Sequence, residues 1–317
     1  MIEVLHPGLQ TQLQDSGRWG WQADGVPVGG AMDGWSHRVA NLLVGNADDE
    51  ATLEILLQGP RLRFARAACI ALVGAELPLT LDGQSVPAGQ RLPVPAGAEL
   101  ACGRARAGLR AYLAVQGGFD VPPVLGSRST YVRGGFGGWQ GRALQAGDRL
   151  PLGPAGTAPS SITALADTSP TLPDADRIEP VLVVPGEHWA AFPADVRRAF
   201  GATAWRVGPQ SDRMGYRLQG PALGAPALGE LLSEGVAFGT VQVPPDGQPI
   251  VLMAERQSTG GYPKIAHVAA VDLPLLAQMA PGQRLRFELI SADRAQALLE
   301  DRERHLALLR LALLETP

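Results

Sequence analysis

The stretch RLRFARAACIALVGA (residues 61–75) and, further along, LRAYLAVQGG (109–118) contain short apolar runs rich in Leu, Ile, Val and Ala. The 39 glycines and 27 prolines are spread through the 317 residues rather than clustered, so such runs are interrupted often. Short apolar segments separated by frequent turn residues are typical of a β-rich barrel or sandwich. The sequence therefore predicts a mainly β protein.

Helices are expected in only a few places. The segment 36–46 has apolar spacing near 3.6 with Ser36 as a candidate N-cap, and 188–200 and 273–279 are weaker candidates. The segment 292–315 lacks Gly and Pro and has high intrinsic helix propensity. Its leucines exceed what one face of a surface helix needs, so we expect it to pack on a domain or at an oligomer interface; they are Leu306, Leu308, Leu309, Leu311, Leu313 and Leu314.

The length indicates two domains, since single domains are usually shorter. A segment dense in Pro, Ser, Thr, Ala and Asp without apolar periodicity, 154–180, is typical of a linker. We therefore expect a first domain over 1–153, a second over 181–290, and a C-terminal helix over 291–317.

Composition excludes several classes of protein. With 45% hydrophobic and 18% charged residues the chain is not of the disordered type, and its net charge of −4 lacks the basic character of a nucleic-acid or membrane-surface binder. We find no signal peptide in MIEVLHPGLQ and no apolar run of 18 residues, so no membrane span is expected. Two cysteines in apolar contexts, Cys69 and Cys102, are expected to be reduced thiols, which favours a cytoplasmic location.

Most of the familiar catalytic motifs are absent. The sequence has no GxxxxGK[ST], HExxH or CxxC, and its five histidines have no ligand spacing, so we expect no P-loop and no metal site. The GSRST stretch (126–130) is not a GxSxG elbow, which disfavours a serine hydrolase.

Glycine-rich polar clusters are the remaining candidates for a site. One spans 14–33, and another, GSRSTYVRGGFGGWQGR (126–142), can present backbone N–H groups and guanidinium groups to a carboxylate or phosphate. A third is 209–220, and the fourth, 239–268, is the richest. Such loops in a β protein are often only turns, and that alternative stays open, although the six polar side chains within 255–264 exceed what a turn needs.

Ordered blocks along the chain resemble the carboxyltransferase-domain A/B family. They include QDSGR (14–18), GSRST (126–130), SDRMGYRLQG (211–220), GTVQVPPDGQPIVL (239–252) and ERQSTGGYPKIA (255–266). The resemblance extends from about residue 5 to 290. It departs from the family pattern at Gly29, where Ser is expected, and at Glu255, where Asp is common.

The resemblance implies a fold of two cyclophilin-like β-barrel domains and a partner subunit of similar fold. The family includes components of bacterial 5-oxoprolinase, so the implied activity is ATP-dependent opening of 5-oxo-L-proline to L-glutamate together with A- and B-type subunits. ATP is then the expected cofactor, and whether this chain or a partner holds it stays open. The family also includes the carboxyltransferase component of biotin-dependent urea or amide carboxylases, which is the alternative that requires biotin. A regulatory role, as an antagonist of a sensor-kinase inhibitor, is a further alternative, and a homo-oligomer is another open alternative.

The resemblance also implies roles for the polar clusters. We expect Lys264, Arg256, Glu255 and Asp15 to be catalytic. The expected substrate-binding residues are Gln14, Arg18, Arg128, Ser129, Thr130, Arg133, Gln242, Gln257, Ser258, Thr259 and Tyr262. Phosphate and carboxylate need positive groups around them, so we expect loops of both barrels to bring Arg128, Arg256 and Lys264 into one anion-attracting cleft.

Overall fold

The computed structural model describes residues 1–154, 172–224, 226, 228 and 231–314. Its contacts divide the chain into two units. Unit 1 consists of Met1–Arg18, Gly29–Leu172 and Arg304–Pro317, and unit 2 of Trp19–Val28 and Pro173–Glu303.

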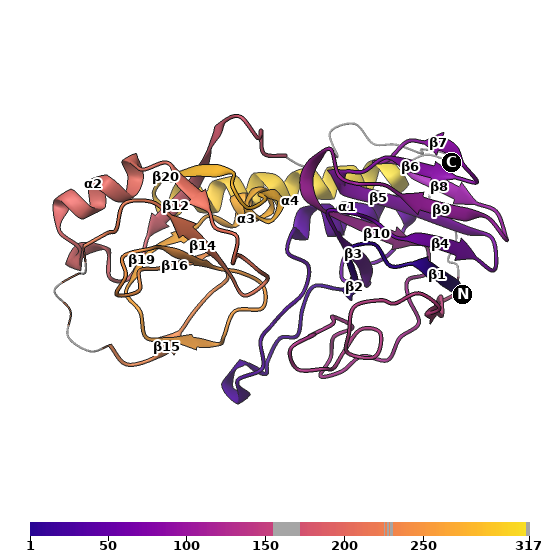
Figure 1. Ribbon diagram of the computed structural model, residues 1–317, viewed down its shortest axis with the longest axis horizontal. Coiled ribbons are helices and arrows are strands. Elements are labelled where there is room, and N and C mark those ends of the chain that lie inside the picture. The colour runs from indigo at the N-terminus through magenta and orange to yellow at the C-terminus, as the bar shows by residue number, and fades with distance from the viewer. Residues whose placement is uncertain (155–171, 225, 227, 229–230, 315–317) are drawn as a thin grey trace. The chain divides into compact units, whose positions relative to one another are not determined.

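Unit 1 is built from two antiparallel sheets (Figure 1). One core cluster draws residues from both sheets, among them Ile2, Leu13, Leu53 and Phe64, which are all fully buried. The six-stranded sheet has the order β11 (Arg149–Leu150), β1 (Ile2–His6), β4 (Arg61–Phe64), β9 (Glu99–Cys102), β6 (Leu79–Leu81) and β7 (Gln84–Val86). The five-stranded sheet has the order β2 (Gln10–Gln14), β3 (Thr52–Leu56), β10 (Ala107–Val115), β5 (Ala68–Glu76) and β8 (Arg91–Val94).

Helix α1 (Gly34–Val44) covers the five-stranded sheet at β5 and β10. It begins where the Asp33 carboxylate accepts a hydrogen bond from the Ser36 N–H at 2.9 Å, and it ends at Gly45, whose φ of 76° is left-handed. The helix expected over 36–46 is therefore confirmed, but it begins at Gly34, and its N-cap is Asp33 and not Ser36, whose N–H the Asp33 carboxylate caps. Leu306, Leu309 and Leu313, from the end of α4 (Ala292–Leu314), join the same apolar cluster, which confirms that the C-terminal helix packs on a domain.

Unit 2 contains a closed barrel of seven strands. Its first and last strands pair in parallel and close the barrel. Trp205 and Phe287 of the barrel are buried, and the buried Phe200 stacks on Phe287 with 4.5 Å between ring centroids. Around the barrel the order is β12 (Ile178–Pro185), β19 (Lys264–Val268), β16 (Thr240–Gln242), β17 (Ile250–Leu252), β14 (Gly215–Gln219), β13 (Trp205–Val207) and β20 (Arg284–Leu289).

Smaller elements complete unit 2. Figure 1 shows α2 (Ala194–Ala202) beside β20, and β15 (Glu234–Gly235) pairs with β18 (Thr259–Gly260) outside the barrel. Short helices occur at η1 (Gln22–Asp24), η2 (Trp189–Ala191), η3 (Ala270–Asp272) and α3 (Leu273–Gln278).

The mainly β class with few helices is confirmed, and unit 2 is the closed barrel that was expected. Unit 1 differs, because its strands form two sheets and not one closed barrel. The chain passes from one sheet to the other at Gly8 and again at 57–60, where a Cβ on Gly8 would meet the Gln58 carbonyl oxygen at 2.3 Å. These two crossings lie side by side, and the Leu9 N–H donates to the Gln58 carbonyl at 2.9 Å between them. The cyclophilin-like type of both halves stays a prediction.

The helices, linker and domain bounds expected from the sequence agree with the structure in some places and differ in others. The helix expected over 188–200 is two pieces, η2 and α2, because Pro193 precedes α2 at its N-cap. The helices expected over 273–279 and 292–315 correspond to α3 and α4. Most of the proposed linker, 155–171, lies outside the described residues, and its last residues already belong to β12. Residues Trp19–Val28 belong to unit 2, which the sequence did not indicate.

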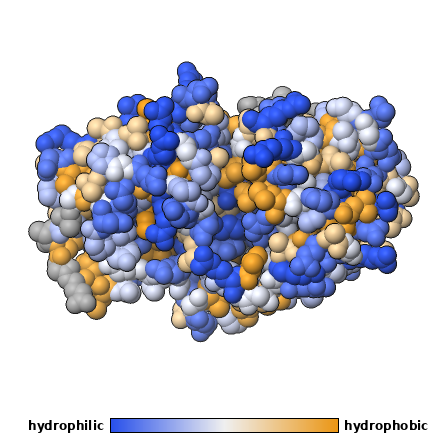
Figure 2. Space-filling model, in the orientation of Figure 1, coloured by the Kyte–Doolittle hydropathy of each residue, from blue (hydrophilic) through white to orange (hydrophobic). Residues whose placement is uncertain are grey.

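Surface and cysteines agree with the composition. Hydrophilic residues cover most of the face in Figure 2, with apolar residues in small groups. Cys69 and Cys102 are free thiols, as expected, and burial raises the pKa of Cys102 to about 12. Among the described helices, none combines the length and apolar character that crossing a bilayer requires.

Candidate functional site

The Asp15 carboxylate organises the GSRST stretch of unit 1. It accepts four hydrogen bonds from described residues: from the N–H groups of Gly17 (2.8 Å) and Arg128 (2.5 Å) and from the hydroxyls of Ser127 (2.7 Å) and Ser129 (2.5 Å). The Asp15 N–H in turn donates to Ser129 Oγ at 3.0 Å. Asp15 is only 7% exposed, and its hydrogen bonds join the 15–17 segment to the GSRST stretch.

Arg18, Gln14 and Thr130 extend this network. The buried Arg18 guanidinium donates to the carbonyl oxygens of Val124 (3.0 Å) and Ser129 (2.7 Å) and lies 4.9 Å from the centre of the Phe136 ring. Gln14 Nε2 donates to the Thr130 carbonyl at 3.0 Å, and Thr130 Oγ1 donates to the Leu13 carbonyl at 3.0 Å. These polar side chains are therefore committed to backbone partners.

Two glycines allow the 134–141 loop to lie directly on these residues. A Cβ on Gly137 (φ +72°) would meet the Ser129 carbonyl oxygen at 2.2 Å, and one on Gly138 (φ +52°) would meet Thr130 Oγ1 at 1.9 Å. Both the left-handed backbone and the close approach require glycine here.

Arg128 and Arg133 are more exposed than the buried Arg18. Arg128 Nε donates to the Val121 carbonyl at 2.9 Å, and its Nη1 lies 3.7 Å from the Glu50 carboxylate. Arg133 is exposed on the 126–142 loop.

Unit 1 also holds buried polar residues that the sequence did not identify. The Glu54 carboxylate in β3 accepts hydrogen bonds from the Met32 N–H (2.9 Å) and the Tyr112 hydroxyl (2.8 Å) and lies 3.9 Å from Arg110 Nε. A glutamate in the otherwise apolar strand TLEIL was the available signal. Nearby, burial lowers the pKa of His37 to about 4, and its Nδ1 lies 2.9 Å from Thr52 Oγ1.

Lys264 is buried in unit 2 and forms an ion pair there. Its Nζ lies 2.9 Å from Glu234 Oε2, and its side chain is 4% exposed, whereas that of Glu234 is 57% exposed. The hydrogen bond from Lys264 holds the pKa of Glu234 below its usual range. Gln242, which is also buried, is the cross-strand neighbour of Lys264.

Arg256 is a second buried cation close by in the chain. Its Nε donates to the Val236 carbonyl at 3.2 Å and its Nη1 to the Met253 carbonyl at 3.4 Å, with the guanidinium 5.8 Å from the centre of the Phe238 ring. Within the described ranges no carboxylate pairs with it, and burial lowers its pKa to about 10. Because Glu234 and Val236 are two residues apart, the segment 234–236 contacts both Lys264 and Arg256.

Glu255 is engaged by a third cation. Its Oε1 lies 2.6 Å from Arg213 Nε, and its N–H donates to the Arg213 carbonyl at 2.7 Å. Both side chains are largely buried, so this pair fixes the start of the 255–262 loop against the 213–214 segment.

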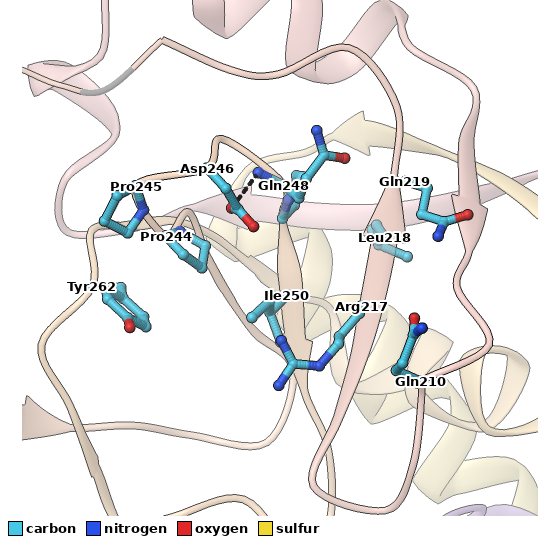
Figure 3. A pocket seen from close by; sticks show the side chains of 11 residues that line it. Gln210, Arg217, Leu218, Gln219, Pro244, Pro245, Asp246, Gln248, Ile250 and Tyr262 are labelled. Carbon is cyan, nitrogen blue, oxygen red and sulfur yellow. Dashed lines mark hydrogen bonds between the residues drawn. The ribbon is translucent and has the colours of Figure 1, made fainter.

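The rest of the 255–262 loop faces outward to varying degrees. Gln257 and Thr259 are exposed, Ser258 is half-buried with its carbonyl accepting from the Val236 N–H, and Tyr262 is 45% exposed. Tyr262 also lines a surface pocket of about 500 Å³ (Figure 3).

The structure brings the expected residues together as two sets. In unit 1 these are Gln14, Asp15, Arg18, Arg128, Ser129 and Thr130, and in unit 2 they are Gln242, Glu255, Arg256, Ser258 and Lys264. One cleft that contains Arg128, Arg256 and Lys264 stays a prediction, since these cations belong to different units. Among the described residues no three His, Cys, Asp or Glu side chains gather as a metal site.

Comparison with known proteins places this chain in a family. Residues 24–289 match the family described as "Carboxyltransferase domain, subdomain A and B", and the chain belongs to that family. It is 41% identical to the C subunit of 5-oxoprolinase from Escherichia coli (strain K12), over 96% of each chain. It is 39% identical to the C subunit of 5-oxoprolinase from Haemophilus influenzae, over 98% of each.

A solved structure has the same fold as a part of a larger enzyme. The crystal structure of the K. lactis urea amidolyase matches with a TM-score of 0.87 and 32% identity. The match covers 97% of this chain but only 20% of the amidolyase chain, so this chain corresponds to about a fifth of that enzyme.

Proposed function

We propose that this chain is the C subunit of a 5-oxoprolinase. In this role it acts with A- and B-type subunits in the cytoplasm to open 5-oxo-L-proline to L-glutamate while ATP is hydrolysed. The observation that carries the proposal is the end-to-end match to the C subunits of two 5-oxoprolinases, which covers at least 96% of both chains in each case.

Lys264 and Arg256 are the residues that we assign to the reaction. An unstrained lactam resists opening, so the carbonyl oxygen must be stabilised as negative charge develops on it. Arg256 offers a guanidinium with no carboxylate partner in the described chain, and Lys264 offers an ammonium whose exposed partner, Glu234, can give way to an incoming anion. We assign Arg128 to anion binding from the unit 1 loop.

The remaining expected residues divide by how their polar atoms are used. Asp15, Glu255, Gln14, Arg18, Ser129 and Thr130 already bind protein partners, so we now assign them to holding the loops in place; for Asp15 and Glu255 this replaces the catalytic role expected from the resemblance. Gln242 is the cross-strand neighbour of Lys264, and the Ser258 carbonyl accepts from the Val236 N–H, so we assign both residues to holding the segments around Lys264 and Arg256. The exposed side chains that can reach a substrate are Arg133, Gln257, Thr259 and Tyr262.

ATP supplies the free energy for ring opening in the assembled complex. The sequence has no GxxxxGK[ST] motif, and we assign no residue of this chain to ATP. The part that this chain takes in the reaction is to bind and polarise the organic substrate.

The proposal is tested by co-expressing the chain with candidate A- and B-type subunits and measuring 5-oxoproline-dependent ATP hydrolysis. We expect activity only when all subunits are present. Lys264→Ala and Arg256→Ala should each lower kcat by roughly 10²-fold or more. Arg284→Ala, which removes an exposed cation from β20, is the matched control and should be neutral. Full activity of Lys264→Ala in an intact complex would refute the assigned role.

A second candidate function is carboxyl transfer to urea or a related amide, favoured by the 32% identity to urea amidolyase of Saccharomyces cerevisiae over 95% of this chain but 17% of that enzyme. Biotin would then be attached to a separate carrier protein, because the only lysine here, Lys264, lacks the Met-Lys-Met context of a carrier. Urea-dependent decarboxylation of a carboxybiotin carrier, without 5-oxoproline-dependent ATP hydrolysis, would select this function instead.

A further inference from the structure

The pocket of about 500 Å³ in unit 2 lies next to the loop that carries Lys264 (Figure 3). The side chain of Gln242 donates to the Tyr262 carbonyl at 3.4 Å, and the Val243 N–H donates to the Pro263 carbonyl at 2.9 Å. Residues 244–247 follow directly and form the turn above the pocket. The volume lies within the 300–1,000 Å³ of typical small-molecule sites.

Arg217 supplies a positive charge to this pocket from an exposed position on β14. Its carbonyl accepts from the Gly208 N–H at 2.8 Å, and its N–H donates to Ser211 Oγ at 3.1 Å, so the backbone of β14 is held on this side. Figure 3 shows the guanidinium extending below Ile250, its cross-strand neighbour. In the described part of the chain the guanidinium makes neither an ion pair nor a hydrogen bond.

Asp246 supplies a fixed negative charge on the opposite side of Ile250 (Figure 3). Its Oδ1 accepts from the Gln248 N–H at 3.0 Å, and the Gln248 amide both donates to and accepts from the backbone of Gly220 at 3.0 Å. The second oxygen, Oδ2, makes no hydrogen bond to a described residue. Gly247 (φ +73°) fits only without a side chain, because a Cβ would meet the Leu223 backbone at 2.6 Å.

Apolar groups line the space between the two charges. Pro244, Pro245 and Tyr262 lie along one side and Leu218 along another, with Ile250 between them. The guanidinium of Arg217 can bind a ligand carboxylate through two parallel hydrogen bonds. The free carboxylate oxygen of Asp246 can accept a hydrogen bond from a ligand N–H. Both charges sit beside surface suited to a small hydrocarbon ring.

We propose that this pocket binds a small carboxylic acid that carries an N–H group next to its carboxylate. The ligand carboxylate binds Arg217, its N–H donates to Asp246, and its ring packs against Pro244 and Tyr262. 5-Oxo-L-proline has all three features, and the choice of this acid rests on the proposed function. Tyr262, which lines the pocket, lies two residues before Lys264 in the chain.

Calorimetric titration of the full chain, alone and co-purified with its partner subunits, tests the pocket with three probes. These are 5-oxo-L-proline, cyclopentanecarboxylate, which lacks the N–H, and 2-pyrrolidinone, which lacks the carboxylate. We expect affinity in that order. Arg217→Gln should weaken both acids by about 10-fold or more and leave 2-pyrrolidinone unchanged. Asp246→Asn should weaken 5-oxo-L-proline by about 5-fold and leave cyclopentanecarboxylate unchanged.

Arg284→Gln is the matched control, because it removes an exposed cation from another strand of the same barrel. Unfolding midpoints equal to that of the wild type establish that each variant is folded. The proposal is overturned when no acid binds in either preparation, or when Arg217→Gln binds 5-oxo-L-proline as well as Arg284→Gln does. Binding with this variant pattern, together with a complex that hydrolyses no ATP, supports the pocket and refutes the 5-oxoprolinase function. If the complex hydrolyses ATP and the KM for 5-oxo-L-proline is the same with Arg217→Gln as with the wild type, the 5-oxoprolinase function is supported and the pocket is overturned.

Discussion

Lys264, the only lysine of the chain, is buried, and its Nζ lies 2.9 Å from the carboxylate of Glu234, which is mostly exposed. The pair is asymmetric, since one partner is fixed inside the protein and the other stands in solvent. The partner of a buried cation is thus the member that can exchange for an anion from solution.

Lys264→Gln should restore the pKa of Glu234 to its usual range. The ammonium stabilises the ionised carboxylate, so its removal makes protonation of Glu234 occur at higher pH. Titration of the Glu234 carboxyl carbon by NMR measures this shift. Arg284→Gln should leave the Glu234 titration unchanged, and an unchanged titration in Lys264→Gln as well would show that the ion pair does not form in solution.

His37 should make the protein sensitive to acid. Burial lowers its pKa from 6.5 to about 4, so between these pH values the unfolded chain binds more protons than the folded one. Stability therefore falls as the pH drops through this window, by roughly 3 kcal/mol in total from this group. We expect the free energy of unfolding of His37→Gln to fall less between pH 7 and pH 4.5 than that of the wild type, by most of that amount. Denaturant unfolding at the two pH values measures both changes. His6→Gln, at an exposed position, should behave as the wild type does.

Gly137→Ala should destabilise unit 1 more than Gly135→Ala. Both glycines have similar positive φ angles, +72° and +68°, but a Cβ on Gly137 meets the Ser129 carbonyl at 2.2 Å, whereas one on Gly135 meets nothing within 4 Å. We expect a cost of about 1 kcal/mol for Gly135→Ala from the backbone alone and about 3 kcal/mol or more for Gly137→Ala. Urea denaturation compares them, and equal costs would mean that the two loops are not in contact.

Leu306→Ala should destabilise the protein far more than Leu308→Ala. Leu306 is 2% exposed in the cluster with α1, whereas Leu308, on the same helix, is 58% exposed. Core truncation of this kind costs about 2–5 kcal/mol, and an exposed leucine should cost within about 0.5 kcal/mol. Thermal or urea unfolding gives the difference, which vanishes if the end of α4 does not pack on unit 1.

Local sequence signals predicted the helices and strands of the fold better than they predicted whether the strands close into a barrel. Short apolar runs and turn residues indicated strands, and Ser36 lay close to the start of α1. Whether strands close into a barrel depends on pairing between residues distant in sequence, such as Gly8 beside Gln58, which no local pattern contains. The break of the expected 188–200 helix, by contrast, was visible in Pro193.

Sequence identified the segments of the candidate site but not the use of each side chain. Asp15 stands out as an acid in a glycine-rich loop, yet its carboxylate is engaged by groups more than 100 residues away, including Ser127 and Ser129. Glu234 was overlooked because a single glutamate in a short polar stretch carries no signal until Lys264 is seen beside it. Arg217 was not among the expected site residues, because a strand pattern does not indicate whether a pocket lies beside the strand.

The parallel pairing of β12 with β20 has a consequence for the order of events during synthesis. The Ile178–Val183 ladder needs the Arg284–Leu289 ladder as its neighbour, and that segment is synthesised after the other six strands of the barrel. Until then β12 has an edge whose backbone N–H and C=O groups are unpaired, and such edges can pair with strands of other chains. Unit 2 therefore cannot close its barrel until β20 has been synthesised.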